Sequence, residues 1–277
     1  MALAFADGMM AQAQLSSSTA TATPSPSRRA SRIPVTRVER FMLTDLAPAE
    51  RRRICDEAYR IHDAYFPDVD RDFFERSFFE GDTTRVFLYY GADGALAGFS
   101  TISLLRVIHE GKEHAIFKGP ACVDARYRLV PRARLSSLVE ALRFKLLHPW
   151  MPVAYMGMVT TPSGYRLFTS AVPRLYPSRH APTPPAIKAL LLAATRMRGF
   201  EPVDEDKLLV RAVSRIAHPE RLLQSRSLAD DPDVRFYLDR NPHLGELSML
   251  MYVPCDLDNI GRGLIRMLRR HLLGDGR

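Results

Sequence analysis

The 277-residue sequence has three cysteines, a single tryptophan and no long hydrophobic run. Cys55, Cys122 and Cys255 are far apart and form neither a CxxC pair nor a Cys/His set with zinc-ligand spacing. We therefore expect no metal site and no disulfide framework, and each cysteine reads as a small buried hydrophobe in a reducing compartment. A transmembrane helix is excluded because no run approaches about 18 consecutive apolar residues.

Acidic residues are the minority charge, with 31 Asp+Glu against 39 Lys+Arg and a formal net charge of +8. A basic surface favours an anionic partner, such as a nucleotide cofactor, an acidic carrier protein or a membrane surface. Basic runs interleaved with aromatic residues are lacking, so we expect no nucleic-acid binding. The composition of 46% hydrophobic and 25% charged residues is that of a globular chain.

Residues 1–33 contain the run SSSTATATPSPSRRASR, whose bias toward Ser, Thr, Ala and Pro does not suit a buried core. A secretory signal is not expected because Asp7 interrupts the short apolar part and Arg28 and Arg29 come late. We interpret the segment as a disordered tail of a cytoplasmic protein. An Arg/Ser-rich, acid-poor transit peptide is the weaker alternative.

Hydrophobic periodicity predicts the order of elements through residue 123. A strand over 35–43 precedes helices over 49–66 and from Asp70. The period then changes to that of strands at 85–90 and 96–107, joined by an Asp93-Gly94 hairpin turn. The next strand covers 114–118 and 121–123, and its Gly119-Pro120 interruption predicts a bulge or the end of pairing.

The pattern from residue 124 alternates again between helices and short strands. A helix with an apolar stripe over 135–146 is followed by a strand over 152–159, a loop over 160–164 and helices over 165–175 and 185–197. Two short strands follow at 200–203 and 207–213. Further strands are predicted at 233–238 and 247–253, either extending the sheet or forming a second layer, before a basic amphipathic helix over 260–273.

This order, over residues 34–213, resembles the GNAT acyltransferase superfamily. Val123-Asp-Ala-Arg-Tyr-Arg128 is similar to the family's V-x-P-x-Y-R run into its cofactor loop, and Met197-Arg-Gly-Phe200 is similar to its x-x-G-F before the last hairpin. The resemblance implies an α+β fold, a mixed central sheet flanked by helices. Residues 1–33 would precede it as a tail, and residues 214–277 would pack on it as a C-terminal strand/helix extension.

The resemblance also implies a cofactor loop, where the family carries [Gln/Arg]-x-x-Gly-x-[Gly/Ala] at a helix start. This sequence has Arg128 and Ala133 at the outer positions but Pro131 in place of the glycine, and proline donates no hydrogen bond. The implied donor-binding residues are Cys122, Val123, Arg128, Arg132, Ala133 and Arg134. A solvated basic loop that caps a core helix is the alternative interpretation.

Tyr165 and Tyr176 are the positional candidates for the tyrosine that protonates the departing thiolate in the family. A phenol with a pKa near 10 is protonated at neutral pH and can act as a general acid. Ordinary amphipathic tyrosines at the edge of a core are the alternative for both. No general base is located by the sequence, although Glu113, His114 and Asp124 flank the fourth strand.

The sequence thus predicts an N-acyltransferase that moves an acyl group to an amine from acyl-CoA or from the acyl-phosphopantetheine of an acyl carrier protein, without a metal. The alternative is an inactive GNAT-like module that binds a protein partner or an anionic membrane. Membrane contact would involve Ile260, Leu264 and Leu268, which share one face of the last helix, opposite its arginines. Docking of that face on the protein's own domain is the other interpretation.

Overall fold

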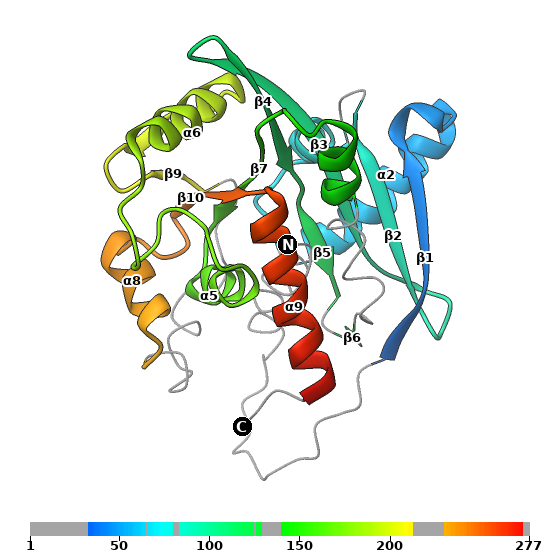
Figure 1. The fold of residues 1–277 in the computed structure, drawn as a ribbon. Coiled ribbons are helices and arrows are strands. Elements are labelled where there is room, and N and C mark those ends of the chain that lie inside the picture. The colour runs from blue at the N-terminus through cyan, green and yellow to red at the C-terminus, as the bar shows by residue number, and fades with distance from the viewer. Residues whose placement is uncertain are drawn as a thin grey trace.

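The structure, a computed structural model, describes residues 33–64, 66–79, 83–124, 126–128, 140–212 and 230–273. The described residues form a ten-stranded mixed sheet in the order β6-β1-β2-β3-β4-β7-β10-β9-β8, with β5 paired to β3 (Figure 1). Helices cover both faces of this sheet. The predicted α+β class, a mixed sheet flanked by helices, is confirmed.

The first half of the sheet is an antiparallel meander, as the alternating pattern and the Asp93-Gly94 turn predicted. Its strands are β1 (Ile33–Met42), β2 (Arg85–Gly91), β3 (Leu96–His109) and β4 (Lys112–Lys118). A 3-10 turn, η1 (Leu43–Asp45), and helices α2 (Pro48–Asp63) and α3 (Arg71–Phe78) connect β1 to β2. The Asp70 carboxylate caps α3 by accepting a hydrogen bond from the Phe73 amide at 2.8 Å, which explains why this helix begins where it does.

The Gly119-Pro120 interruption separates β4 from β5 (Ala121–Val123) without a change of register. The Thr101 amide still donates to the Pro120 carbonyl at 3.0 Å, so pairing with β3 continues past the proline. The expected bulge was therefore wrong, and pairing ends here only on the β7 side, after Phe117. Glycine is needed at position 119 because a Cβ there would lie 2.1 Å from the Thr101 carbonyl oxygen.

The second half of the sheet is assembled out of chain order. Strand β7 (Val153–Val159) pairs in parallel with β4 on one side and antiparallel with β10 (Leu247–Pro254) on the other. Strand β10 also pairs with β9 (Leu209–Arg211), which forms a hairpin with β8 (Pro202–Asp204). A strand near the carboxyl end of the chain thus lies between two strands that precede it.

Two expectations were wrong at helix starts. Residues 160–164 were predicted as a loop, but α5 (Pro162–Ala171) begins there, with the Thr161 hydroxyl accepting from the Gly164 amide at 3.0 Å. Residues 233–238 were predicted as a strand, but they belong to α8 (Pro232–Arg240), which Asp231 caps. In both cases a capping side chain precedes a proline in the first turn, a stronger signal than the short apolar alternation.

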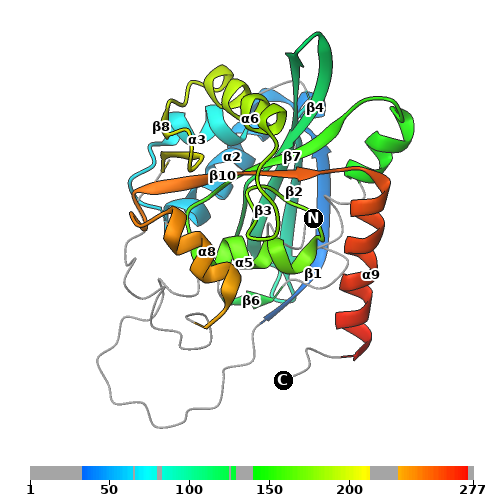
Figure 2. The ribbon, with the colours of Figure 1, turned by 60° about the vertical axis from the view of Figure 1, so that its left-hand side comes forward.

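Alternating strand side chains divide the core between the two faces of the sheet. Tyr155 of β7 and Met251 of β10 lie in a cluster with side chains of α5, α8, residues 140–147 and α9 (Leu257–Leu273). We call the side of the sheet that carries this cluster the first face. On the second face, α2 and α3 cover β2 and β3, whereas α6 (Pro185–Met197) covers β7 and β10. Figure 2 shows α9 and the α2/α3 pair on opposite sides of the sheet.

Helix α9 is held on the first face by its amino-terminal turns. Ile260 is buried and Leu264 packs against the core, so these two side chains contact the protein's own domain. Asn259, also buried, accepts from the Arg174 amide at 3.0 Å and donates to the Arg174 carbonyl at 2.9 Å and the Pro254 carbonyl at 2.7 Å. Membrane contact through this face stays a prediction that requires Ile260 and Leu264 to leave the core.

Among the described helices, none is both long enough and apolar enough to cross a membrane.

Replacing Asn259 with alanine should destabilise the fold because it removes three hydrogen bonds and leaves the polar backbone atoms of Arg174 without their partner. We expect the free energy of unfolding to fall by about 2–4 kcal/mol in denaturant titrations. Arg262→Gln, on the exposed face of the same helix, should change it by less than about 0.5 kcal/mol. Equal stability of the two variants would contradict the role of Asn259 as the anchor of α9.

His62 of α2 is a buried titratable group on the second face. Its ring packs against those of Phe66, Phe74 and Phe78, with centroids 4.8–5.3 Å away, and its Nδ1 has no hydrogen-bond partner among the described residues. Burial lowers the pKa of His62 from 6.5 to about 4, since this apolar site disfavours the imidazolium.

The pKa of His62 predicts an acid-sensitive fold. Between pH 6.5 and 4 the unfolded chain binds a proton that the folded chain does not, so the free energy of unfolding should decrease as the pH falls. The slope from this residue is about 1.4 kcal/mol per pH unit, or about 3 kcal/mol over the window. In unfolding titrations, His62→Leu should lose correspondingly less unfolding free energy between pH 6.5 and 4 than the wild type. The same pH dependence in both proteins would contradict the lowered pKa of His62.

Candidate functional site

Strands β4 and β7 are parallel neighbours that separate beside β5, which carries the predicted donor-binding residues Cys122 and Val123. Strands β4 and β7 pair only between Ala115–Phe117 and Val153–Tyr155. Beyond this point β10 is the only described strand that pairs with β7. Strand β5 pairs with β3 on one edge, and no described strand pairs with its other edge. Parallel strands that separate leave backbone groups facing each other without ladder partners, which is an arrangement suited to holding an extended ligand.

The chain leaves β5 through a turn that Asp124 organises. The Asp124 amide donates to the Ala97 carbonyl at 2.8 Å, and its carboxylate accepts from the Arg126 amide at 2.9 Å and from the Arg126 guanidinium at 2.7–3.1 Å. Both oxygens of the Asp124 carboxylate therefore accept hydrogen bonds that stabilise the turn. Asp124 therefore has a structural role that competes with any role as a general base.

Tyr127 fixes the segment that follows. Its ring is buried against Gly91, where a Cβ would lie 2.3 Å from a ring carbon, and its hydroxyl donates to the Asp93 carboxylate at 2.8 Å. Strand β6 (Tyr127–Arg128) then pairs in parallel with Ile33 and Pro34 of β1. The Tyr-Arg pair of the motif thus carries the chain across the first face to the edge of the sheet.

Residues 140–147 form a helix that returns over the first face. Ala141, Leu142 and Phe144 pack against the core there. Glu140 forms ion pairs with Arg85 of β2 and with Arg40 of β1, the latter at 3.2 Å. This helix, α5 and α9 all contribute to the core cluster of the first face, beside the point where β5 and β7 separate.

Cys122 and Val123, predicted near the donor, point to opposite faces of the sheet. Cys122 packs beneath α2, with its sulfur 4.0 Å from the Ile61 carbonyl oxygen, and burial raises the pKa of its thiol. It is therefore no nucleophile in this state. Val123 belongs to the core of the first face, so only its backbone is placed to contact a ligand along β5.

Tyr165 lies in the first turns of α5 and shares a core cluster with Val123. The side chain is fully buried, and its hydroxyl donates to the Pro177 carbonyl at 2.9 Å. Burial also raises the pKa of the phenol, which keeps it protonated. The hydroxyl proton of Tyr165 is thus engaged in a hydrogen bond within the protein, as expected for a tyrosine with a structural role.

Tyr176 is on the opposite face. Its backbone forms an isolated bridge with Tyr252 of β10, with hydrogen bonds of 2.7 and 2.8 Å, and its half-buried side chain packs with the α6 cluster. The structure therefore brings Tyr165 and Val123 to one face of the sheet but does not bring Tyr176 there.

The remaining predicted donor contacts are only partly within the described residues. Arg128 is placed by its backbone in β6, whereas Arg132, Ala133 and Arg134 lie outside the described ranges. No cluster of three or more His, Cys, Asp or Glu side chains suited to a metal ion occurs in the part of the chain that the structure describes.

Comparisons with known proteins give only weak structural similarity. No protein-family model matches the sequence, and no curated protein is similar to it. One similar solved structure is a tetramutant of the BH1408 protein from Bacillus halodurans, with a TM-score of 0.27 and 12% identity over 43% of this chain and 80% of the other.

Two further similar structures are acetyltransferases by name. One is a GCN5-related glucosamine N-acetyltransferase region of a fungal multi-domain GH3 β-N-acetylglucosaminidase, with a TM-score of 0.32 and 16% identity over 64% of this chain and 18% of that one. The other is a candidate phosphinothricin N-acetyltransferase, with a TM-score of 0.30 and 11% identity over 52% of this chain and 88% of that one.

Tyr165→Phe separates the structural role of this tyrosine from a chemical one. Loss of the hydroxyl leaves the buried Pro177 carbonyl without its donor, so the free energy of unfolding should fall by about 1–3 kcal/mol. Tyr176→Phe should change it by less than about 0.5 kcal/mol. Denaturant titration measures both, and unchanged stability of Tyr165→Phe together with a large loss of acyl transfer would instead make the phenol a catalytic acid.

Proposed function

We propose that the protein is an N-acyltransferase of the GNAT type, which transfers an acyl group from a thioester to an amine. The observation that carries the proposal is the short parallel pairing of β4 with β7, after which β5 and β7 separate on the first face. An extended pantetheine arm between them would meet backbone amides that point away from β3. The order of strands β1 to β4, then β7, agrees with the element order that the sequence predicted.

The reaction would proceed by direct attack. The amine nitrogen attacks the thioester carbonyl carbon, and backbone N–H groups near Ala121–Val123 stabilise the oxyanion. The carbon–sulfur bond then breaks, the amine loses a proton to water, and the thiolate takes up a proton. Of the two candidate acids only Tyr165 shares the face of Val123, and its phenol would first have to leave the Pro177 carbonyl.

Two donors fit the charge of the chain. Acyl-CoA would place its pyrophosphate on the loop after Arg128, where arginines supply charge-assisted hydrogen bonds. An acidic acyl carrier protein would be attracted by the net charge of +8 and would need no cradle for a nucleotide pyrophosphate, which agrees with Pro131 in the motif.

The second candidate function is a non-catalytic module that keeps the fold for binding a protein partner or an anionic membrane. The observation that favours it is the state of the predicted chemical groups. The phenol of Tyr165 donates to a backbone carbonyl, and the thiol of Cys122 is buried beneath α2. Such a module would bind without turnover.

Arg128→Ala tests the donor site. If a pyrophosphate binds the loop, loss of one charge-assisted contact of about 1.5–3 kcal/mol should weaken acyl-CoA binding roughly 10- to 150-fold in calorimetric titrations. With a carrier-protein donor, the change should instead appear as slower, salt-sensitive association.

The matched control is Arg106→Ala, which removes an exposed arginine of β3 that pairs with Glu113 at 2.7 Å. It should leave both dissociation constants and the melting temperature unchanged. Wild-type binding of both donors by Arg128→Ala, or no binding of either donor by the wild-type protein, would favour the non-catalytic module.

A further inference from the structure

A polar cleft of about 510 Å³ lies among α5, the residues after it, α8 and α9. Its lining consists of Arg166, Thr169, Ser170, Arg179, His180, Asp231, Asp233, Arg266 and Arg269. The volume falls within the range of small-molecule sites, which is about 300–1,000 Å³. None of these side chains belongs to the strand edges or the loop at which the thioester donor is proposed to bind.

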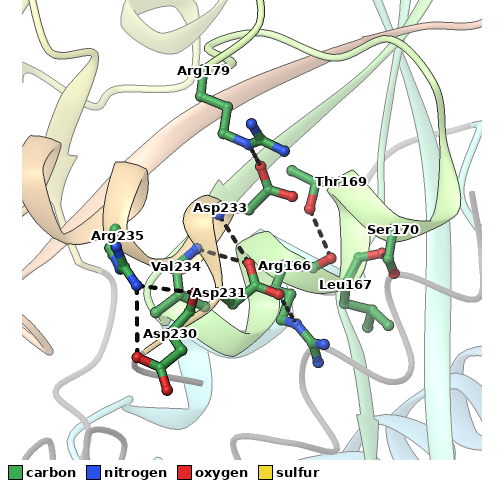
Figure 3. A network of polar contacts seen from close by, with 10 residues as sticks. All are labelled: Arg166, Leu167, Thr169, Ser170, Arg179, Asp230, Asp231, Asp233, Val234 and Arg235. Carbon is green, nitrogen blue, oxygen red and sulfur yellow. Dashed lines mark hydrogen bonds and ion pairs between the residues drawn. The ribbon is translucent and has the colours of Figure 1, made fainter. Parts of the chain in front are cut away.

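Two of the four arginines in the lining are neutralised. Arg166 of α5 donates to the Asp231 carboxylate at 2.5 Å, and Arg179 donates to the Asp233 carboxylate at 2.7 Å (Figure 3). Asp231 also accepts from the amides of Asp233 and Val234 at the start of α8. Burial opposes ionisation of Asp231, but the hydrogen bonds from Arg166 and the backbone outweigh it and lower the pKa of the carboxyl, which stays charged.

The other two arginines, Arg266 and Arg269, lie on α9. They are three residues apart and therefore neighbours on one face of the helix. Both side chains are exposed, and neither has a carboxylate partner among the residues that the structure describes. By contrast, Arg262, one turn earlier on α9, is paired with Asp258 at 2.8 Å.

The charges of the cleft therefore do not balance. Among the described residues that line the cleft, four guanidinium groups face two carboxylates, which leaves an excess of two positive charges. The hydroxyl groups of Thr169 and Ser170 donate to carbonyls of their own helix. Within the described lining, Arg266 and Arg269 are therefore the cationic donors that no carboxylate engages. Guanidinium groups side by side match the oxygens of a phosphate, which can accept two parallel N–H···O bonds from each.

We propose that this cleft binds a phosphate group carried by a small molecule, with Arg266 and Arg269 as the principal ligands and Arg166 and Arg179 as its ion-paired rim. The phosphate can come from a soluble phosphate ester or from a lipid headgroup, and the same side chains would bind either. The inference does not depend on acyl transfer, because the cleft is built from α5, α8 and α9 and not from β5 or its loop.

Inorganic pyrophosphate is the probe for a soluble phosphate ester, and lipid vesicles are the probe for a phosphate-bearing headgroup. The full-length protein should bind pyrophosphate in calorimetric titrations, or phosphatidylglycerol vesicles in preference to phosphatidylcholine vesicles in co-sedimentation. In either arm, Arg266→Gln and Arg269→Gln should each weaken binding at least tenfold, and the double variant about 100-fold. Higher salt should weaken wild-type binding, because both arginines are exposed.

The matched control is Arg235→Gln/Arg262→Gln, which removes two exposed arginines that pair with Asp230 and Asp258 outside the cleft. It loses the same charge as the double variant in the cleft and should bind as the wild-type protein does. All of these variants change exposed side chains, so their melting temperatures should stay near that of the wild type.

Asp233→Asn gives a test by gain of binding. Removing its charge frees Arg179 and removes repulsion of the anion, so pyrophosphate or headgroup binding should tighten roughly three- to tenfold. Wild-type binding by the double variant Arg266→Gln/Arg269→Gln, an equal loss in the Arg235/Arg262 control, or no binding of either probe by the wild-type protein would overturn the proposal.

Discussion

Insertion of β10 between β7 and β9 is the constraint on which the rest of the second half depends. The Met251 and Val253 side chains of this strand enter the core of the first face, while Leu250 and Tyr252 enter the core beneath α6. One strand therefore joins two hydrophobic clusters, and its ladders cover one edge of β7 and one edge of β9. Because β10 ends at Pro254, it also sets where α9 begins.

The helices of the first face are then held by buried polar contacts. Asn259 ties the start of α9 to Pro254 and to Arg174 after α5. Tyr237 of α8 donates to the Val159 carbonyl at the end of β7 at 3.0 Å, and Asn241 donates to the Tyr237 hydroxyl at 3.1 Å. Each bond satisfies a polar group that burial would otherwise penalise. Together they fix α5, α8 and α9 around the arginine-lined cleft.

Burial on the first face also limits the ability of Tyr165, the candidate general acid, to donate its proton to a substrate. A tyrosine that protonates a leaving thiolate needs a free path to the sulfur. Tyr165 instead packs against Phe236 and Tyr237, with ring centroids 5.8 Å away, and donates inward. The backbone edges where β5 and β7 separate are therefore more accessible to a thioester than the Tyr165 phenol is.

Local patterns in the sequence determined most of the elements. Alternation and the Asp93-Gly94 turn predicted the meander, and the apolar stripes predicted α2, α6 and α9, because these signals reflect the period of each element. The errors at α5 and α8 were also local, since Thr161-Pro162 and Asp231-Pro232 are capping signals that were read as loop or strand. The α+β class followed from the order of these elements.

Tertiary structure alone decided where the elements meet. Periodicity predicted a strand at 247–253 but left open whether it extends the sheet or forms a second layer, because the hydrogen-bond partners of a strand are distant in sequence. For the same reason the sequence does not show that the arginines of α5, of the segment after it and of α9 lie close together. Only the packing of α5, α8 and α9 brings them to one cleft and pairs two of them with aspartates, because charge compensation is a property of distance in space.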